Sequence, residues 1–397
     1  MTYKKPNILC YRFAQAVTWL AAKLIFKRKI LRNEIKGKKG PFLVLANHQC
    51  AYDFVNLMSA ARRPMSFVIS RSFYNSLPLK GFLKTLGVIP KQQFQTSAKD
   101  LKQIKAVVDA GEPVVIYPAG LMSENGLPTP TPTATYKLLK WLDTDVYVAR
   151  SSGTYFVMPK WTTGFRPGRT HLDVYKLFSK EELQALSMEQ IRRKTAQALD
   201  FDAYKEQEEL LVKYKKGSCV EGLENVLYMC PNCGREFTIR VRDGHTLYCT
   251  ECGFAQKSDE YAFLHNESGK GAQLRYVSDW SKLIYATLKE KISRGQDTLL
   301  SAKTKFHMID PKKNKFAEVG TGTVTLDPDA FLIEGVIHGK ETSLSAPIAS
   351  FASLPFSPGK YFEIQYGPDI YRCVLEDGRL AMKFINMVKI FYELKAR

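Results

Sequence analysis

The sequence predicts an α/β domain with a mixed sheet flanked by helices, then a four-cysteine segment, then a small β-rich domain with a terminal helix. Three observations carry this prediction. Strand-like and helix-like segments alternate over the first 218 residues, two C-x-x-C pairs follow, and short alternating runs fill the C-terminal third. The 397 residues are 45% hydrophobic and 24% charged, which is ordinary for a globular protein of two or three domains.

The N-terminal segment is strongly basic. Residues 1–40 carry eleven Lys or Arg against one acid, Glu34, and the whole chain has a formal net charge of +19. The stretch 10–32 combines Trp19 and Phe26 with clustered cations, which suits a helix in a membrane interface but is too short in its apolar part to span a bilayer. We expect residues 1–40 to contact membrane phospholipids. Nucleic acid is a less favoured polyanion, and a helix packed on the core is the structural alternative.

Residues 41–218 show the alternation that predicts the α/β domain, and a charged helical stretch at 187–216 closes it. Buried strands are expected at 42–47, 65–70, 113–120, 145–150 and 171–178, with helices such as 99–110 and 133–142 between them.

A histidine and a carboxylate, His48 and Asp53, follow the first of these strands. A carboxylate on one imidazole nitrogen fixes the tautomer, and the other nitrogen is then free to take a proton from a hydroxyl. The spacing fits equally well a His and an Asp that only cap a helix. No Ser or Cys nucleophile is needed, and a helical offset would point Cys50 elsewhere.

The pattern N-H-x-x-x-x-D resembles the first signature of the glycerolipid acyltransferases, the lysophosphatidic acid acyltransferase family. Residues 67–91 are similar to the second block of that family, and residues 114–126 are similar to the third, a strand running into a phosphate-binding loop. The resemblance implies that His48 deprotonates an acceptor hydroxyl and that Asp53 orients it. The acyl donor would be acyl-CoA or acyl-carrier protein, with no acyl-enzyme.

The third block departs from the family pattern. The family usually reads Pro-Glu-Gly-Thr-Arg-Ser, and here Ala119 and Met122 replace the Glu and the Arg. The acceptor either keeps a phosphate or carries another lipid or polyol head group. A lipid-binding pseudoenzyme is disfavoured because His48 and Asp53 are intact. The candidate substrate contacts are Asn47, Arg71, Lys91, Gly120 and Ser123.

Two cysteine pairs predict a structural metal site in residues 226–258. Each pair is a C-x-x-C-G knuckle, and fifteen residues that resemble a hairpin with an Asp243-Gly244 turn separate them. The arrangement resembles a zinc ribbon, in which four thiolates close the zinc and leave no open position for catalysis. The expected zinc ligands are Cys230, Cys233, Cys249 and Cys252.

The C-terminal region, 278–397, predicts a helix near 278–293, short alternating strands and an apolar terminal helix. It loosely resembles a pleckstrin-homology-like barrel, which would suit lipid or protein docking.

Together these features predict an O-acyltransferase that acylates the hydroxyl of 1-acylglycerol 3-phosphate or a related lysolipid. We expect it in the cytoplasm, peripheral on the inner face of the membrane, with no secretory signal and reduced cysteines. The alternative is a non-enzymatic zinc-ribbon adaptor that binds a lipid membrane or nucleic acid.

Overall fold

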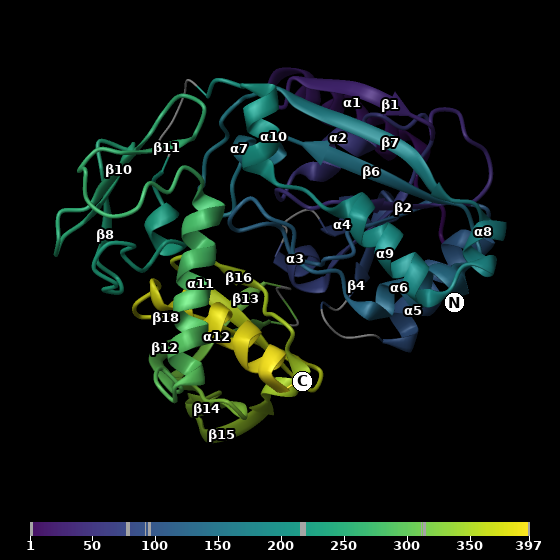
Figure 1. Cartoon of the computed structure of the whole chain (residues 1–397). Helices are drawn as coiled ribbons and strands as arrows, with labels where there is room; N and C mark the ends of the chain where they lie inside the picture. Colours follow the sequence, from purple (N-terminus) through teal and green to yellow (C-terminus); the bar gives the residue numbers. More distant parts are fainter. Residues whose placement is uncertain are drawn as a thin grey trace. The chain divides into compact units, whose positions relative to one another are not determined.

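A computed structural model of the protein describes residues 3–76, 80–91, 93, 97–214, 220–310, 312 and 315–395. The chain divides into two compact units, Met1–Lys216 and Gly217–Arg397 (Figure 1).

The first unit is built on a seven-stranded mixed sheet, which confirms the predicted α/β domain. The strand order is β1-β7-β6-β2-β5-β3-β4, and β7 runs antiparallel to β6. The strands are β1 (Arg28–Asn33), β2 (Leu43–Ala46), β3 (Ser66–Ser70), β4 (Ile89–Lys91), β5 (Val114–Ile116), β6 (Val146–Ser152) and β7 (Thr170–Phe178).

Helices cover both faces of this sheet, so the central strands read as continuous apolar runs. The side chains of Leu43 and Leu45 pack toward α5, α6, α8 and α9, whereas Val44 and Ala46 pack toward α1, α2 and α4. The helices are α1 (Ile8–Leu24), α2 (Asp53–Met58), α3 (Arg71–Ser76), α4 (Lys80–Thr85), α5 (Ala98–Asp109), α6 (Thr133–Leu142), α7 (Thr154–Val157), α8 (Lys180–Ala185), α9 (Met188–Leu199) and α10 (Ala203–Leu210).

The expectation of one helix over residues 10–32 is wrong for its last part. Helix α1 ends at Leu24, Lys27 takes a positive φ of 40°, and residues 28–33 form the edge strand β1, which pairs in parallel with β7. Side chains on both faces of β1 are largely exposed, so the residues show no period-2 alternation. Backbone pairing with a strand far along the sequence therefore decides the conformation.

The second unit begins with a ribbon of four antiparallel strands in the order β11-β10-β9-β8. Its predicted hairpin turn is confirmed, because Asp243 and Gly244 both have positive φ in the three-residue connection between the paired Arg242 and Thr246. The elements are a 3-10 turn at Leu223–Asn225, β8 (Ile239–Arg242), β9 (Thr246–Cys249), β10 (Ala255–Ser258) and β11 (Leu264–Asn266).

The rest of the second unit is a seven-stranded antiparallel sheet, preceded in the sequence by one helix and followed by another, which agrees with the predicted β-rich region and terminal helix. Its order is β15-β14-β13-β12-β18-β17-β16, so a four-strand meander joins a three-strand meander. The pleckstrin-homology-like interpretation stays a prediction. The elements are α11 (Val277–Ser293), β12 (Leu300–Ile309), β13 (Phe316–Leu326), β14 (Ala330–Ile337), β15 (Lys340–Pro347), a 3-10 turn at Ile348–Ser350, β16 (Phe356–Ser357), β17 (Tyr361–Tyr366), β18 (Asp369–Leu375) and α12 (Leu380–Lys395).

Helix α12 forms the core of this unit, since residues 381–388 are all buried. It also binds the ribbon. The ammonium of Lys383, itself buried, contacts the carboxylates of Glu236 at 2.7 Å and Asp297 at 3.0 Å. The indole of Trp280 in α11 donates to the carbonyl of Met229 at 2.9 Å. The ribbon and the β-rich region therefore share one core.

Candidate active site

The candidate residues of the first unit gather at one edge of the sheet. Strands β2, β5, β3 and β4 are parallel neighbours, so their carboxyl ends meet there. His48 follows β2, the loop at 117–126 follows β5, Arg71 follows β3, and Lys91 ends β4. The carboxyl edge of such a sheet is the usual place for a ligand.

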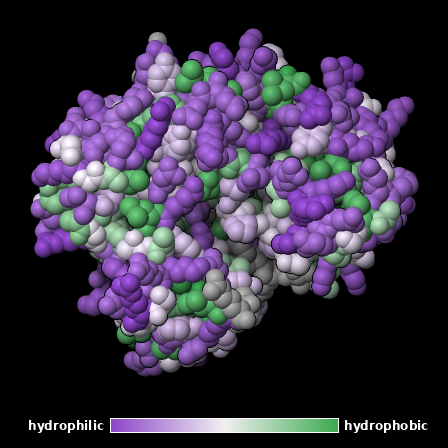
Figure 2. Space-filling view, viewed as in Figure 1, coloured by the Kyte–Doolittle hydropathy of each residue, from purple (hydrophilic) through white to green (hydrophobic). Residues whose placement is uncertain are grey.

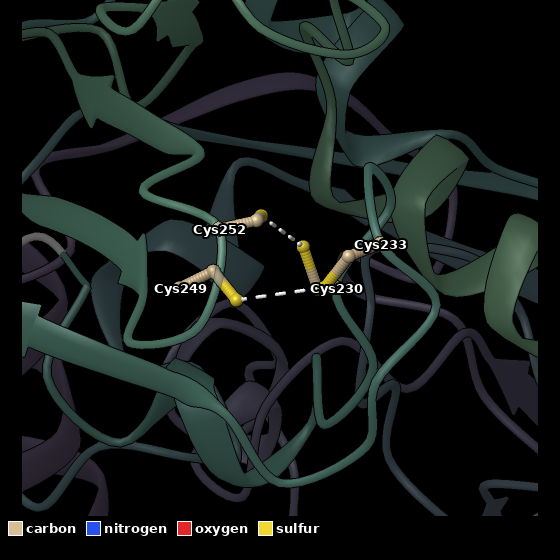
Figure 3. A group of neighbouring side chains, drawn as sticks. All are labelled: Cys230, Cys233, Cys249 and Cys252. Carbon is tan, nitrogen blue, oxygen red and sulfur yellow. Dashed lines mark hydrogen bonds between the residues drawn. The ribbon is translucent and has the colours of Figure 1, made fainter.

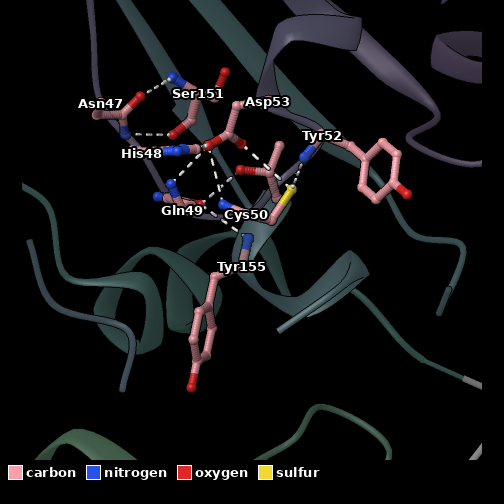
Figure 4. A network of polar contacts seen from close by, with 9 residues as sticks. Asn47, His48, Gln49, Cys50, Tyr52, Asp53, Ser151 and Tyr155 are labelled. Atoms are coloured by element: carbon pink, nitrogen blue, oxygen red, sulfur yellow. Dashed lines mark hydrogen bonds and ion pairs between the residues drawn. The ribbon is translucent and has the colours of Figure 1, made fainter. Parts of the chain in front are cut away.

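His48 and Asp53 are joined directly, with 3.0 Å between Nδ1 and Oδ2 (Figure 4). The Asp53 carboxylate is buried, and the same oxygen accepts the backbone amides of Gln49 at 2.7 Å and Cys50 at 2.9 Å. These donors fix the carboxylate, and the carboxylate fixes the imidazole. With Nδ1 engaged, Nε2 is the ring nitrogen left for a proton from a ligand.

The Cys50 side chain points toward Asp53, so the expectation that it points elsewhere is wrong. Its thiol lies 3.5 Å from the second carboxylate oxygen of Asp53 and is fully buried (Figure 4). Residues 47–52 form a turn, and α2 begins only at Asp53, so helical spacing does not apply. Burial, together with the Asp53 charge, raises the pKa of the thiol well above its ordinary value. Cys50 is therefore a neutral neighbour of Asp53 and no nucleophile.

Tyr117 is a neighbour of His48 that the sequence analysis missed. The two ring centroids are 4.7 Å apart, and the buried Tyr117 hydroxyl has no hydrogen-bond partner among the described residues. Burial, and to a lesser degree the charge of Asp53, raises the pKa of this phenol well above its ordinary value. The ring therefore supplies a neutral aromatic wall beside the imidazole. An aromatic residue after a buried strand gives no sequence signal for this role.

Three predicted contacts use their polar groups to hold the site together. The Asn47 side chain donates to the carbonyl of Ser151 and accepts its amide, both at 2.8 Å (Figure 4). The Gly120 amide donates to the carbonyl of Tyr117. The Ser123 hydroxyl is buried, donates to the carbonyl of Leu127 and accepts an amide within the same loop. These groups position backbone around His48 and are not directed at a ligand.

The two predicted basic contacts, Arg71 and Lys91, share one buried acid. Arg71 donates to Asp100 at 2.8 Å, and the Asp100 side chain is fully buried in the first turn of α5. Burial lowers the pKa of Lys91, and the charge of Asp100 partly opposes this. The carboxylate of Asp100 thus offsets one of the two positive charges at this end of the edge.

A second network of polar side chains holds the turn at residues 47–52 in place. The Gln49 side chain accepts the hydroxyl of Thr154 and the amide of Tyr155, both at 3.1 Å, and donates to Glu206 of α10. Glu206 also accepts from Arg150 of β6 at 3.0 Å. The turn that carries His48 is therefore tied to α7, α10 and β6.

A cavity of about 210 Å³ opens beside His48 on the side of α6 and α9. Its walls come from the ends of β2 and β5, the proline-rich loop at 128–131 and the C-terminal end of α9. The lining residues are Ala46, Asn47, His48, Pro118, Ala119, Pro128, Thr129, Pro130, Thr131, Tyr136, Ala196, Leu199, Asp200 and Phe201.

In the second unit, the four predicted cysteines come together (Figure 3). The sulfur of Cys230 lies 3.6 Å from that of Cys252, and the sulfurs of Cys233 and Cys249 are 3.8 Å apart. A tetrahedron with Zn–S bonds of about 2.3 Å has edges of about 3.8 Å, so these donors fit zinc. The arginines of the ribbon that could bind nucleic acid are largely engaged, Arg235 with Glu251 and Arg242 with Glu267.

Comparison with known proteins agrees with the sequence blocks. Residues 27–161 match the family model described as Acyltransferase. This segment therefore resembles an acyltransferase domain. Comparison with curated proteins gives no match. The solved structures to which the chain is similar include the 1-acyl-sn-glycerophosphate (LPA) acyltransferase, PlsC, from Thermotoga maritima, at 18% identity over 52% of this chain and 81% of that chain, with a TM-score of 0.42.

Proposed function

We propose that the first unit transfers a fatty acyl group from the thioester of acyl-CoA or acyl-carrier protein to the hydroxyl of a lysolipid of the 1-acylglycerol class. The observation that carries this proposal is the His48–Asp53 pair, fixed by two backbone amides and open to a cavity.

In this reaction the His48 Nε2 takes the proton of the acceptor hydroxyl as the oxygen attacks the thioester carbonyl. The new C–O bond forms, the C–S bond breaks, and the imidazolium returns the proton to the leaving thiolate. Asp53 stabilises the imidazolium without taking the proton, and Tyr117 packs against the same ring. The buried Cys50 thiol takes no part.

The test measures release of free CoA from palmitoyl-CoA in the presence of 1-acylglycerol 3-phosphate and, separately, 1-monoacylglycerol. We expect His48→Ala and Asp53→Asn to lower the rate by about 10²- to 10⁴-fold, the range of a lost general base. His265→Ala changes an exposed histidine of the second unit and serves as the control. If neither acceptor gives release that depends on His48, the proposal is refuted.

We further propose that Cys230, Cys233, Cys249 and Cys252 hold one Zn²⁺. When bound, the ion is closed by four thiolates and serves the fold of the second unit, because it keeps no open position for a substrate.

We propose that α1 docks on a membrane surface. Apolar residues exposed along one side of this helix recur every three or four positions: Leu9 (78% exposed), Phe13, Val17, Leu20 and Leu24. Figure 2 shows a hydrophobic area at the upper edge of the view, where Figure 1 labels α1. No helix in the described residues is both long and apolar enough to cross a bilayer.

A further inference from the structure

The cavity beside His48 lacks positive charge. Among the described residues that line it, none is a Lys or an Arg, and the ionisable lining residues besides Tyr136 are His48 and Asp200. The remaining walls are mostly Ala, Pro, Leu and aromatic residues, with the hydroxyls of Thr129 and Thr131. A phosphate in this space would face apolar carbon and a carboxylate, which is unfavourable for an anion.

The predicted cations nearest to the cavity on the sheet edge do not supply the missing positive charge. Arg71 follows β3, two strands from β2, which corresponds to about 10 Å at the usual strand spacing. Its guanidinium is bound to the buried Asp100. Lys91 lies one strand further and is only partly exposed, and the sequence between Lys91 and Ser97 contains no basic residue.

Two amides of the predicted phosphate-binding loop, those of Gly120 and Ser123, already have hydrogen-bond partners. The amide of Gly120 donates a hydrogen bond to the carbonyl of Tyr117. The carbonyl of Gly120 accepts one from the side-chain amide of Gln93. The Ser123 amide donates to the carbonyl of His48 at 3.0 Å, so it too serves the turn.

On the basis of the proposed acyl transfer, we infer that the acceptor is an uncharged lysolipid, whose free glycerol hydroxyls lie in this cavity beside His48. Thr129 and Thr131 offer hydrogen bonds to such hydroxyls, and the apolar walls suit the glycerol carbons. Asp200 disfavours a phosphate at the same place.

The experiment compares two acceptors that differ only in the phosphate, 1-monoacylglycerol and 1-acylglycerol 3-phosphate, with palmitoyl-CoA and with palmitoyl-acyl-carrier protein as donors. We expect kcat/KM for 1-monoacylglycerol to be higher by about tenfold or more with either donor. Asp200→Lys should narrow this preference, because it replaces the one carboxylate of the cavity with a cation at the C-terminal end of α9, where a cation is tolerated. Glu209→Lys makes the same change of charge at an exposed position of α10 outside the cavity and should leave the preference unaltered.

The outcomes separate the two proposals. Faster, His48-dependent transfer to 1-acylglycerol 3-phosphate would overturn the uncharged acceptor and leave the acyltransferase standing. If Asp200→Lys and Glu209→Lys change the acceptor preference equally, the change reflects the net charge of the protein. That outcome would overturn the role of the cavity. Failure of both acceptors would refute the acyltransferase and this inference with it.

Discussion

Asp53 holds the turn of the candidate active site in place, because one of its oxygens accepts the His48 ring and two backbone amides. The sequence could predict this pair because both residues lie within six positions of each other, after one buried strand. It could not predict the places of Cys50 and Tyr117. The position of Cys50 depends on a turn at a place where a helix was expected. The position of Tyr117 depends on the pairing of β5 with β2.

Glu206 is a partly buried carboxylate whose ionisation should oppose folding. Burial raises its pKa above the ordinary 4.5, although Arg150 and Gln49 oppose the shift. Because the folded-state pKa is raised, protonation of Glu206 stabilises the fold fully at pH values below this ordinary pKa. The stabilisation is lost as the pH rises through the folded-state pKa. Glu206→Gln should therefore raise the melting temperature at pH 7.5, and the gain should vanish near pH 4.

Thermal unfolding across this pH range checks the prediction, with Glu209→Gln, an exposed neighbour in α10, as the control. A variant that is less stable than the parent protein at pH 7.5 would show that the pair with Arg150 outweighs the cost of burial.

At the scale of elements, the segment in which α1 ends and β1 begins shows where hydrophobic periodicity fails to predict secondary structure. Strand β1 is exposed on both faces at the sheet edge, so the local sequence pattern does not indicate its pairing with β7. Central strands such as β2 were predictable because helices bury both of their faces. The short strand β4 escaped prediction because three residues carry no period.

The exposed apolar side of α1 should govern binding to anionic membranes. Leu9→Gln combined with Leu20→Gln removes apolar surface without burying a polar group, since both side chains are exposed. We expect binding to vesicles of phosphatidylglycerol and phosphatidylcholine to weaken by about tenfold or more, as expected for two lost leucine contacts, with little change in melting temperature.

Cosedimentation with vesicles measures this effect. Leu299→Gln, which changes an exposed leucine of the second unit, is the matched control. Equal binding by the double variant and the parent protein would rule out α1 as the docking helix.

At the scale of the whole molecule, the sequence separated the ribbon from the β-rich region, whereas both lie in one compact unit. The cysteine spacing predicted the cluster of four sulfurs because each knuckle is local. The shared core was not predictable, because it depends on Lys383 of α12 reaching Glu236 across 147 positions of sequence.

Removal of zinc should therefore destabilise the entire second unit. We expect about one Zn²⁺ per chain, and a strong chelator should lower the melting temperature of this unit while the first unit melts as before. Cys233→Ser should reproduce the effect without a chelator, and Cys10→Ser, which changes a thiol of α1, should not. Metal analysis with calorimetry tests this, and a chain that binds no metal and ignores the chelator would contradict it.

The late position of α12 in the sequence has a consequence for folding during synthesis. Lys383 follows the last knuckle by about 130 residues, which the ribosome adds in roughly 7 to 26 s at 5–20 residues per second. The four thiols, by contrast, are complete once Cys252 has emerged. During this interval the ribbon lacks the contact between Glu236 and Lys383, and the proposed zinc would be available to hold its four cysteines before the shared core is complete.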